Sequence, residues 1–387
     1  MIVLQDLSQK LIKNSNQRRI LSLVRQAKKT TKAEIAKCLK LSIPTVTSNI
    51  TLLEEAGFLR QSEGADSTGG RPPAVIEFLG DSYYSVGTEI KWESTDIIIT
   101  DLNYCCVARQ ELAVGLKAGM GSVIQAMEDW LERSIAALQL PAEKILGVGF
   151  SLHGIVDEES LCIKFPFADR WFDFSRYKNR LKWPVFLENE ANLGAKAELE
   201  IGLAAREAHD IVFLSINQGV GAGVVISDHL YKGRSSGAGE FGHTVVQNQG
   251  RRCRCGMLGC WEAYVSVPAL EESYPGGRRP AAEIFESYER GEAAAVRHVD
   301  EYIHFLGLGI RNIMLILDPD YIIIGGEMSL YAHLFQDKLS SVLQESLRPI
   351  HPLRHILRIS GLKQEASLLG AAMLPLESVF NLNNRIL

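Results

Sequence analysis

The first 60 residues carry the hydrophobic spacing of three short helices. From Asn16 to Lys28, apolar residues recur at intervals of three and four, which predicts one amphipathic helix: Ile20, Leu21, Leu23, Val24 and Ala27. Thr31 with Glu34 forms a capping-box pattern, which predicts a second helix with inward residues Ile35, Ala36 and Leu39. After a tight turn at 40–42, Ser42 is placed to cap a third helix.

This third predicted helix has two different faces. Its apolar positions are expected to face the core: Ile43, Val46, Ile50 and Leu53. Its outer surface is expected to carry short hydrogen-bonding side chains: Thr45, Thr47, Ser48, Asn49 and Thr51. Two short helices with such a face on the second one match a helix-turn-helix whose second helix enters the major groove of DNA. The alternative is a small helical cap with a solvated polar face.

Two strands and an extended segment follow these helices. Apolar Phe58 and Leu59, a polar glycine-rich stretch at 61–70 and the run Val75 to Phe78 predict a two-stranded wing. Arg71 lies in a Gly-Gly-Arg-Pro-Pro segment that is expected to be extended along a phosphate backbone or into a minor groove. The candidate DNA-binding residues are therefore Ser42, Thr45, Thr47, Ser48, Asn49 and Arg71. Residues 1–80 form the predicted winged helix-turn-helix domain.

After residue 80 the pattern changes to strands that alternate with helices, which indicates an α/β fold. Strands are predicted at 83–86, 97–100, 145–150, 211–216, 222–226 and 321–324, and helices around 122–138 and 302–317. Two α/β lobes are expected: residues 81–190, to which 371–387 can return, and residues 191–370. A further short strand, Val185 to Leu187, delivers the polar string 188–192 to its carboxyl end, where open α/β sheets bind ligands.

Composition and charge narrow the class of protein. The chain has 387 residues, 46% hydrophobic and 22% charged, which excludes a disordered or fibrous protein. The net charge of −5 divides into +5 for residues 1–80 and −10 for the remainder, so a basic head precedes an acidic body. The sequence has no apolar run of about 18 residues, the length needed to span a bilayer. Residues 1–13 lack a signal-peptide pattern. A cytoplasmic location without a membrane partner is expected.

The cysteines predict a metal site. Three of the seven lie close together at Cys253, Cys255 and Cys260, and His243 precedes them. One imidazole and three thiolates complete a tetrahedral zinc site, which leaves no open position for an activated water, so its role would be structural. The alternative is a surface loop of reduced cysteines. Four other cysteines are expected to be small buried hydrophobes: Cys38, Cys105, Cys106 and Cys162.

Four motifs together resemble the ROK family of bacterial sugar kinases and sugar-responsive repressors. They are Glu240-Phe241-Gly242-His243, the C-x-C-G-x-x-G-C-x-E element from Cys253 to Glu262, Asn189-Glu190-Ala191-Asn192, and Gly325-Gly326-Glu327. The helix-turn-helix pattern ahead of them points to the repressor branch, and the string 188–192 is most similar to that of xylose repressors. The resemblance implies an actin-like ATPase body of two lobes around a cleft.

The resemblance also implies which residues hold a sugar: Asn189, Glu190, Glu240, His243 and Glu262. Carboxylate and amide side chains suit the vicinal hydroxyls of a sugar. His243 would bind zinc through one ring nitrogen and point the other toward the sugar. For each carboxylate alone, a solvated surface acid or a helix cap is the alternative. His153 and Trp171 are candidates for choosing pentose or hexose, or else a satisfied loop histidine and a core aromatic.

Departures from the kinase pattern predict that the chain is not an enzyme. Kinases of the family carry Asp as the base where this chain has Glu190, whose longer side chain changes the placement on which proton abstraction depends. The first phosphate loop lacks its leading Asp and carries Glu89, and the second replaces its usual opening with Asn217 and Gln218. Glycines in that second loop could equally serve close strand packing.

We therefore expect a sugar-responsive repressor with xylose as its inducer, acting as a homodimer or higher oligomer on a pseudo-palindromic operator in double-stranded DNA. The alternatives are an ATP-dependent sugar kinase, an activator, and a repressor controlled by a partner protein or a phosphosugar. In the phosphosugar case, Arg234 or Lys232 would compensate the acidic lining of the cleft.

Overall fold

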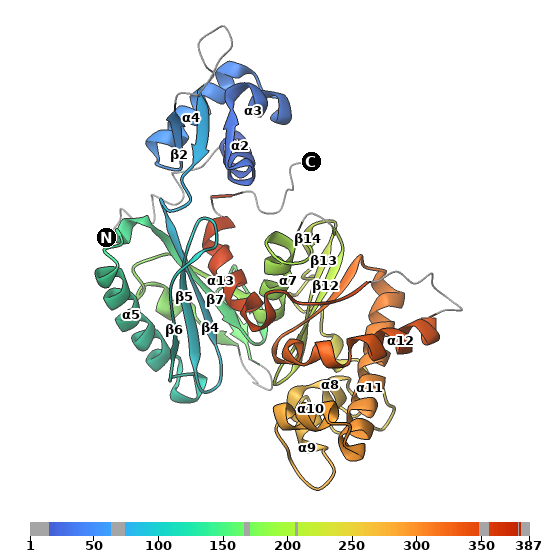
Figure 1. Ribbon diagram of the computed structural model, residues 1–387. Helices are drawn as coiled ribbons and strands as arrows, with labels where there is room; N and C mark the ends of the chain where they lie inside the picture. Colours follow the sequence, from blue (N-terminus) through green and yellow to red (C-terminus); the bar gives the residue numbers. More distant parts are fainter. Residues whose placement is uncertain are drawn as a thin grey trace. The chain divides into compact units, whose positions relative to one another are not determined.

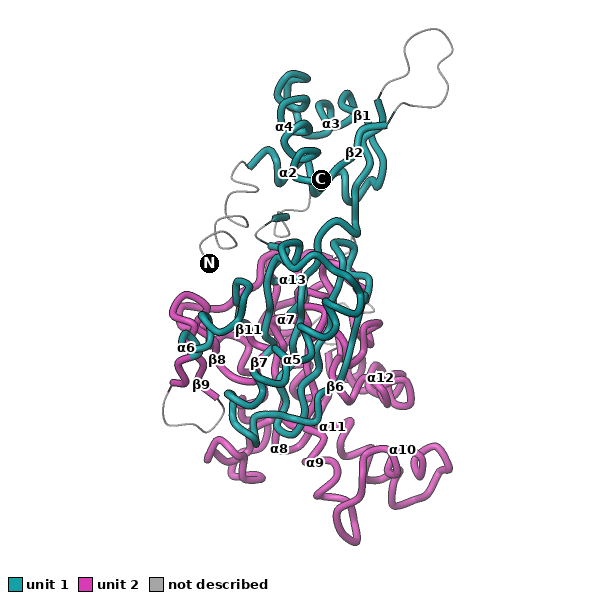
Figure 2. Tube along the Cα trace, turned by 90° about the vertical axis from the view of Figure 1, so that its left-hand side faces the viewer, with its two compact units in different colours: residues 1–151, 174–187, 371–387 teal, residues 152–173, 188–370 magenta. Residues whose placement is uncertain are grey.

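The computed structural model describes residues 15–62, 74–165, 171–205, 208–347, 356–377 and 379–380. The chain divides into two compact units, coloured separately in Figure 2. Unit 1 comprises residues 1–151, 174–187 and 371–387, and unit 2 comprises 152–173 and 188–370. Compared with the expected lobes, residues 152–173 and 188–190 group with unit 2, and the N-terminal head groups with unit 1. Among the described residues, no helix is long and apolar enough to cross a membrane.

The N-terminal head of unit 1 contains the three predicted helices and a small sheet (Figure 1). The helices are α2 (Ser15–Ala27), α3 (Lys32–Leu39) and α4 (Ile43–Glu55). The expected wing, β2 (Leu59–Ser62) and β3 (Val75–Phe78), is confirmed, and β1 (Lys29–Thr31) adds a third strand in the order β1-β3-β2. The capping box of Thr31 and Glu34 is also confirmed.

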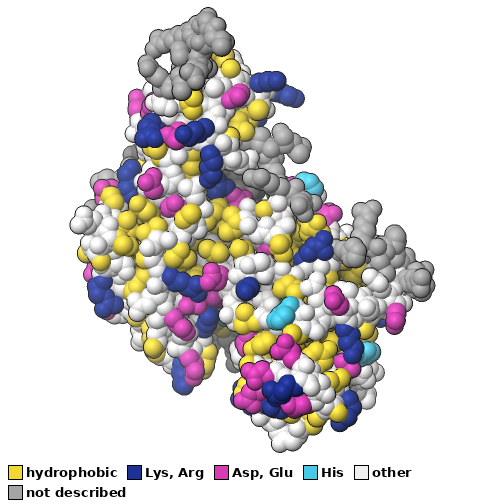
Figure 3. Space-filling model, viewed as in Figure 1, with side chains coloured by type: hydrophobic (Ala, Val, Ile, Leu, Met, Phe, Trp, Pro, Cys, Tyr) yellow, Lys and Arg dark blue, Asp and Glu magenta, His cyan; other side chains and the backbone are white. Residues whose placement is uncertain are grey.

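Two details of the head depend on local geometry. Lys40 ends α3 with a φ of 54°, a left-handed conformation that the turn requires although no glycine is present. Ile43 is 48% exposed, so its assignment to the core is wrong. It is the first residue of α4, ahead of the turns that pack on the other helices. Basic and acidic side chains are interspersed on the visible face of the head (Figure 3). Within the head, Glu77 pairs with Lys29 and Arg60.

The rest of unit 1 is built on a five-stranded sheet in the order β11-β7-β4-β5-β6. The strands are β4 (Tyr84–Ile90), β5 (Thr95–Asp101), β6 (Cys106–Leu112), β7 (Ile145–Leu152) and β11 (Val185–Asn189). Helix α5 (Met120–Ala137) lies along the sheet beside β6 (Figure 1), and α6 (Ser175–Lys178) precedes β11. Helix α13 (Ala366–Glu377) packs on β7 at Gly149, where a Cβ would lie 1.9 Å from the carbonyl oxygen of Ala371. Short 3-10 turns are η1 (Leu116–Ala118) and η2 (Ala142–Lys144).

Within unit 1, aromatic contacts join the head to this sheet. The ring of Tyr83 stacks on Phe58 with centroids 4.5 Å apart, and its hydroxyl donates to the carbonyl oxygen of Ala56 at 2.7 Å. Arg25 of α2 lies over the rings of Tyr104 and Phe380, at 4.9 and 4.7 Å from the centroids. The head is therefore attached by packed side chains and not only by its connecting chain.

Unit 2 contains a second five-stranded sheet with the same connectivity, β14-β13-β12-β15-β16. Its strands are β12 (Ile211–Ile216), β13 (Val220–Ile226), β14 (His229–Leu230), β15 (Tyr321–Gly325) and β16 (Leu357–Ile359). Helix α7 (Glu190–Glu200) covers one face. The other face shares one hydrophobic cluster with five helices: α8 (Glu262–Val265), α9 (Val267–Glu272), α10 (Ala281–Glu289), α11 (Ala293–Leu317) and α12 (Gln336–Leu347).

Successive side chains of β12 point to opposite faces of the sheet, and this alternation explains the two layers. Val212, Leu214 and Ile216 join the cluster that includes the helical layer, whereas Ile211 and Phe213 join the cluster on the side of α7. A small sheet of β8 (Ile155–Asp157), β9 (Cys162–Lys164) and β10 (Phe172–Asp173) completes unit 2. Its 3-10 turns are η3 (Phe241–His243), η4 (Glu327–Leu330), η5 (Ala332–Leu334) and η6 (Lys363–Glu365).

Four cysteines and one tryptophan lie differently from expectation. Cys38, Cys105 and Cys106 are exposed and Cys162 is partly exposed, so their assignment as buried hydrophobes is wrong. Cys38 lies on the outward side of α3, while Cys105 and Cys106 follow a left-handed turn at Tyr104 that leads into the edge strand β6. Trp171 is 49% exposed and is therefore not a core aromatic.

Candidate functional sites

The outer face of α4 carries most of the predicted DNA-binding side chains. Ser42 caps the helix, since its hydroxyl accepts from the backbone N–H of Thr45 at 3.3 Å. Ser48 and Thr51 are exposed, and each hydroxyl donates to a backbone carbonyl three or four residues earlier. Thr45 and Thr47 are half-buried. Hydroxyls bonded in this way keep free lone pairs and can rotate toward a partner. Arg71 lies outside the described residues.

Asn49 is the exception on α4, and its assignment to the outer face is wrong. Its side chain is only 5% exposed, and its Nδ2 donates to the carbonyl oxygen of Thr45 at 2.7 Å. Positions 46, 49, 50 and 53 form the i, i+3, i+4, i+7 stripe that packs against the other helices. Helical spacing therefore places Asn49 in the core, although its polarity suggested the surface.

A cluster of soft metal ligands lies in unit 2 between η3 and α8. The ligand atoms of His243, Cys253, Cys255 and Cys260 all lie within 4.8 Å of one another. Cys253 and Cys260 are buried, and burial raises the pKa of the Cys253 thiol to about 12. A buried thiol of this kind keeps its proton unless a cation replaces it. Three sulfurs and one imidazole within this spacing fit a tetrahedral ion such as zinc.

The ring of His243 faces two ways. Its Nδ1 lies 3.7 Å from the Sγ of Cys253, and its Nε2 lies 3.8 Å from a carboxylate oxygen of Glu240. One nitrogen thus faces the cysteine cluster while the other faces a candidate sugar ligand. A metal held at Nδ1 would fix the orientation of the ring.

Glu190 is the most buried of the candidate sugar ligands. Its side chain is 8% exposed, and its Oε1 lies 3.5 Å from Nδ1 of His153, which is half-exposed. Its Oε2 is buried without a hydrogen-bond partner among the described residues. A buried carboxylate oxygen without a partner is costly, so this atom is suited to accept from a ligand hydroxyl. The structure brings His153 to this site, as one of its two sequence interpretations allowed.

Asn189 precedes Glu190 and has a structural task. Its Oδ1 accepts from the backbone N–H groups of Ala191 and Asn192 at 2.9 and 3.2 Å, which makes it the N-cap of α7. Its Nδ2 donates to the carbonyl oxygen of Gly154 at 2.9 Å. The amide retains one N–H for a ligand.

The hairpin between β12 and β13 approaches two candidate carboxylates. Glu262 accepts from the backbone N–H of Val220 at 3.0 Å, and its other oxygen lies 3.7 Å from the Sγ of Cys253. A Cβ on Gly219 would lie 2.8 Å from Glu262, and one on Gly221 would lie 3.1 Å from Glu190. These glycines therefore leave room beside both acids. Gly223 instead serves close packing, because a Cβ there would lie 2.3 Å from the backbone of α7.

Glu240 belongs to the same group of charges. Its side chain is half-exposed. Desolvation by surrounding atoms raises the pKa of its carboxyl, attraction to His243 opposes this, and repulsion from Glu262 and Glu190 adds to it. We define these four residues, Glu190, Glu240, His243 and Glu262, together with Asn189, as the polar wall of unit 2.

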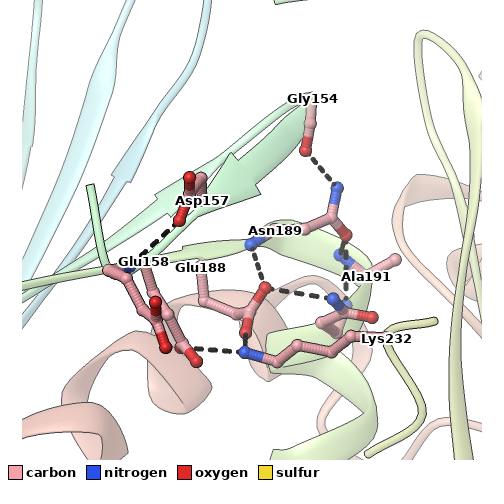
Figure 4. Close-up of polar contacts among 9 residues, drawn as sticks. Gly154, Asp157, Glu158, Glu188, Asn189, Ala191 and Lys232 are labelled. Carbon is pink, nitrogen blue, oxygen red and sulfur yellow. Dashed lines mark hydrogen bonds and ion pairs between the residues drawn. The ribbon is translucent and has the colours of Figure 1, made fainter. Parts of the chain in front are cut away.

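A buried ion pair that the sequence did not reveal involves Glu188, which directly precedes Asn189 of the polar wall (Figure 4). Glu188 is 2% exposed, and its Oε2 lies 2.5 Å from Nζ of Lys232, which follows β14. The same ammonium lies 2.8 Å from Glu158, which follows β8. Lys232 was predicted only as a possible partner of a phosphosugar. Its charge is shared between two carboxylates, so it favours no additional anion.

The two segments that were compared with kinase phosphate loops, around Ser85 and Asn217, form hydrogen bonds within their own units. Asn217 accepts from the backbone N–H of Glu327 at 2.6 Å and so connects the β12–β13 hairpin to the end of β15. In unit 1, Ser85 donates to the carbonyl oxygen of Ala372 at 2.6 Å. Glu89 is a buried residue of β4. These side chains already have roles in packing.

Comparisons with known proteins agree with the two parts of the chain. Residues 86–378 match the ROK family, and residues 13–60 match the winged helix-turn-helix DNA-binding family. A xylose repressor of Bacillus spizizenii is 26% identical over 375 residues, which cover 95% of this chain and 97% of that protein.

Two solved structures are similar in fold. One is a ROK family transcriptional regulator described as a homolog of the E. coli MLC protein, with a TM-score of 0.81, 20% identity and coverage of 95% of this chain and 97% of the other. The other is the ROK hexokinase of Thermus thermophilus, with a TM-score of 0.64 and 26% identity over 75% of this chain and 97% of that enzyme. The regulator is matched along nearly the whole chain, whereas the hexokinase leaves a quarter of it unmatched.

Proposed function

The chain belongs to the ROK family, and we propose that it is a sugar-responsive transcriptional repressor. One observation carries this proposal: the chain combines a winged helix-turn-helix head with a polar wall in which a buried carboxylate oxygen has no hydrogen-bond partner among the described residues. The head would bind double-stranded operator DNA, and the wall would bind the sugar. Xylose is the proposed inducer because of the xylose repressor among the similar proteins.

In this proposal each residue of the polar wall has a separate task. Glu190 accepts from a sugar hydroxyl at its free Oε2, and Glu240 and Glu262 accept from further hydroxyls. Asn189 donates its remaining N–H, and His243 donates or accepts through Nε2. Vicinal hydroxyls both donate and accept, so a wall of mixed acids and amides suits a neutral sugar better than an anion.

Zinc would be structural. The four ligands fill a tetrahedral shell, so the ion would hold His243 and the segment leading to Glu262 without activating water. When bound, it supplies charge that keeps the thiols ionised. Glu262 belongs to the polar wall and contacts both Val220 and the metal-ligand candidate Cys253.

Loss of kinase activity is part of the proposal. Glu190 stands where kinases of the family carry Asp, and its longer side chain holds a hydroxyl without the placement that proton abstraction needs. Asn217 and Ser85 are engaged in backbone contacts where phosphate loops would be expected. The chain would keep the sugar site and use it for sensing.

Release of DNA requires that sugar prefer one state of the protein. A shift in the population from 99:1 to 1:99 takes about 5.5 kcal/mol of differential binding. A homodimer would place two heads on two half-sites one helical turn of DNA apart. Sugar bound at the polar wall would favour the state in which this spacing is lost.

Fluorescence anisotropy tests the proposal directly. Labelled duplexes from the region upstream of the protein's own gene are compared with random duplexes and titrated with xylose, glucose and N-acetylglucosamine. We expect specific binding that xylose releases. Absence of specific binding at every salt concentration would refute the repressor. In that case, a coupled assay for ADP release with ATP and sugar decides whether the protein is a kinase.

A further inference from the structure

The ion pair of Glu188 and Lys232 connects three segments that carry candidate sugar-binding or sugar-selecting residues. Glu188 is the second-last residue of β11 and directly precedes Asn189 and Glu190. Its Oε1 accepts from the backbone N–H of Asn189 at 2.8 Å and from Nδ2 of Asn192 at 3.0 Å. Its second oxygen faces Lys232 (Figure 4). The carboxylate therefore links the N-terminal corner of α7 to the chain that follows β14.

Lys232 extends this connection to a third segment. Its ammonium also binds Glu158, which lies in the turn after β8, a few residues beyond His153 and Gly154. Gly154 in turn accepts from Asn189, and His153 faces Glu190. From Lys232 the chain continues to Glu240. The Lys232 side chain thus contacts the segment of Asn189 and Glu190 and the segment of His153 and Gly154, and Lys232 itself lies eight residues before Glu240.

From this geometry, we propose that Lys232 and Glu188 are positioning residues that set the sugar affinity of the polar wall. Neither touches the sugar in this proposal. They act by fixing the conformation of residues 188–192, where β11 ends and α7 begins, so that Oε2 of Glu190 stays buried and can accept from a sugar hydroxyl. The inference rests on the proposed sugar-binding function of the same wall.

The physical reason is the burial of Glu188. With its side chain 2% exposed, the carboxylate is compensated by Lys232 and by two N–H groups. If Lys232 is removed, a buried charge loses its partner, and the corner of α7 must move to admit water. Only the fraction of molecules that keep the original conformation of residues 188–192 would bind sugar, so the apparent association constant is the intrinsic one multiplied by that fraction.

Burial and attraction act in opposite directions on Lys232. Desolvation alone lowers the pKa of its ammonium, but attraction to Glu188 and hydrogen bonds to Glu158 and Glu188 raise it overall. The ammonium therefore stays charged beside both acids. Glu158 is half-exposed, with 55% of its side chain accessible, and water can replace it.

The test is calorimetric titration of the full-length protein with xylose. We expect Lys232→Met to weaken xylose binding about tenfold or more, because a buried charge is left without its partner. Lys232→Arg should retain most of the affinity because it restores a cation. Glu158→Gln should change it by about twofold or less, as expected of an exposed pair.

A double variant distinguishes the effect of leaving the Glu188 charge unpaired from the effect of merely removing the lysine side chain. In Lys232→Met with Glu188→Gln, no buried charge remains unpaired, so the affinity should be closer to the wild type than in Lys232→Met alone. Arg278→Met is the matched control. It removes a cation that lies 2.9 Å from Glu271, whose side chain is 13% exposed, in the same unit but outside the wall.

Four outcomes would overturn the inference. These are wild-type affinity in Lys232→Met, no recovery in the double variant, an equal loss in Arg278→Met, and loss of operator binding by sugar-free Lys232→Met. The last two would indicate general destabilisation. If the wild-type protein binds operator but none of the tested sugars, the proposed sugar function fails, and the inference fails with it. A wild-type protein that binds xylose while Lys232→Met also binds it normally refutes only the inference.

Discussion

The candidate DNA-binding face of α4 and the polar wall of unit 2 are both polar surfaces, but they are built in different ways. On α4 the candidate residues lie within eight positions of one another, and hydroxyls such as that of Ser48, which donates to the carbonyl oxygen of Thr45, bond within the same helix. The wall draws on segments far apart in sequence, for example where Val220 meets Glu262. Substitutions on α4 should therefore act independently, whereas those in the wall should affect one another.

The largest effect is expected from the cluster of His243, Cys253, Cys255 and Cys260, because in our proposal its zinc holds His243 and the segment that leads to Glu262. Cys260→Ser should remove zinc, because three ligands hold it far less well than four, and structural zinc contributes about 10 kcal/mol to folding in small metal domains. We expect elemental analysis to show about one zinc per chain in the wild type and almost none in the variant, with a lower melting temperature and loss of sugar binding.

Cys105→Ser is the control for this experiment, because Cys105 is an exposed thiol in unit 1. It should change neither zinc content nor sugar binding. A wild-type protein that is free of metal, fully folded and responsive to sugar would show that the wall does not need the ion.

The second largest effect is expected from Glu190, the proposed acceptor of a sugar hydroxyl. Glu190→Gln should weaken xylose binding roughly 10- to 100-fold, because hydrogen bonds to a charged group are worth about 1.5–3 kcal/mol. Operator binding without sugar should be retained, since Glu190 lies in unit 2 and the head in unit 1. Calorimetry and anisotropy measure the two quantities. Glu289→Gln, an exposed acid of α10, should affect neither; equal sugar affinity in both variants would remove Glu190 from the site.

Sequence reasoning performed well where the signal was local. The capping box of Thr31 and Glu34 and the bounds of β12 follow from spacing over a few residues, and the structure confirms them. It failed for Asn49 because residue polarity was weighed above helical period. The Glu188–Lys232 pair was out of reach, since periodicity carries no information about which charges meet across 44 positions of the chain. For the same reason, the sequence left His153 either as a sugar-selecting residue or as a satisfied loop histidine.

The third prediction tests the corrected face of α4. Asn49→Ala should destabilise the head by about 1–3 kcal/mol, because it removes a buried hydrogen-bonding group. Ser48→Ala should leave stability unchanged and lower discrimination between operator and random DNA. Denaturant unfolding, with hydrogen exchange at the amides of α4, measures the first, and anisotropy measures the second. The reverse pattern would return Asn49 to the reading face and Ser48 to a structural role.

The smallest effect separates two roles of Ser42, which caps α4 and also lies among the candidate DNA contacts. Ser42→Ala should cost about 1 kcal/mol of stability, whereas Ser42→Gly should cost only a few tenths, because glycine is tolerated at an N-cap. Both variants lack the hydroxyl. If they lose operator affinity equally despite their different stabilities, the hydroxyl contacts DNA. If the loss of affinity follows stability, Ser42 acts only by starting the helix, and the DNA-binding face begins at Thr45.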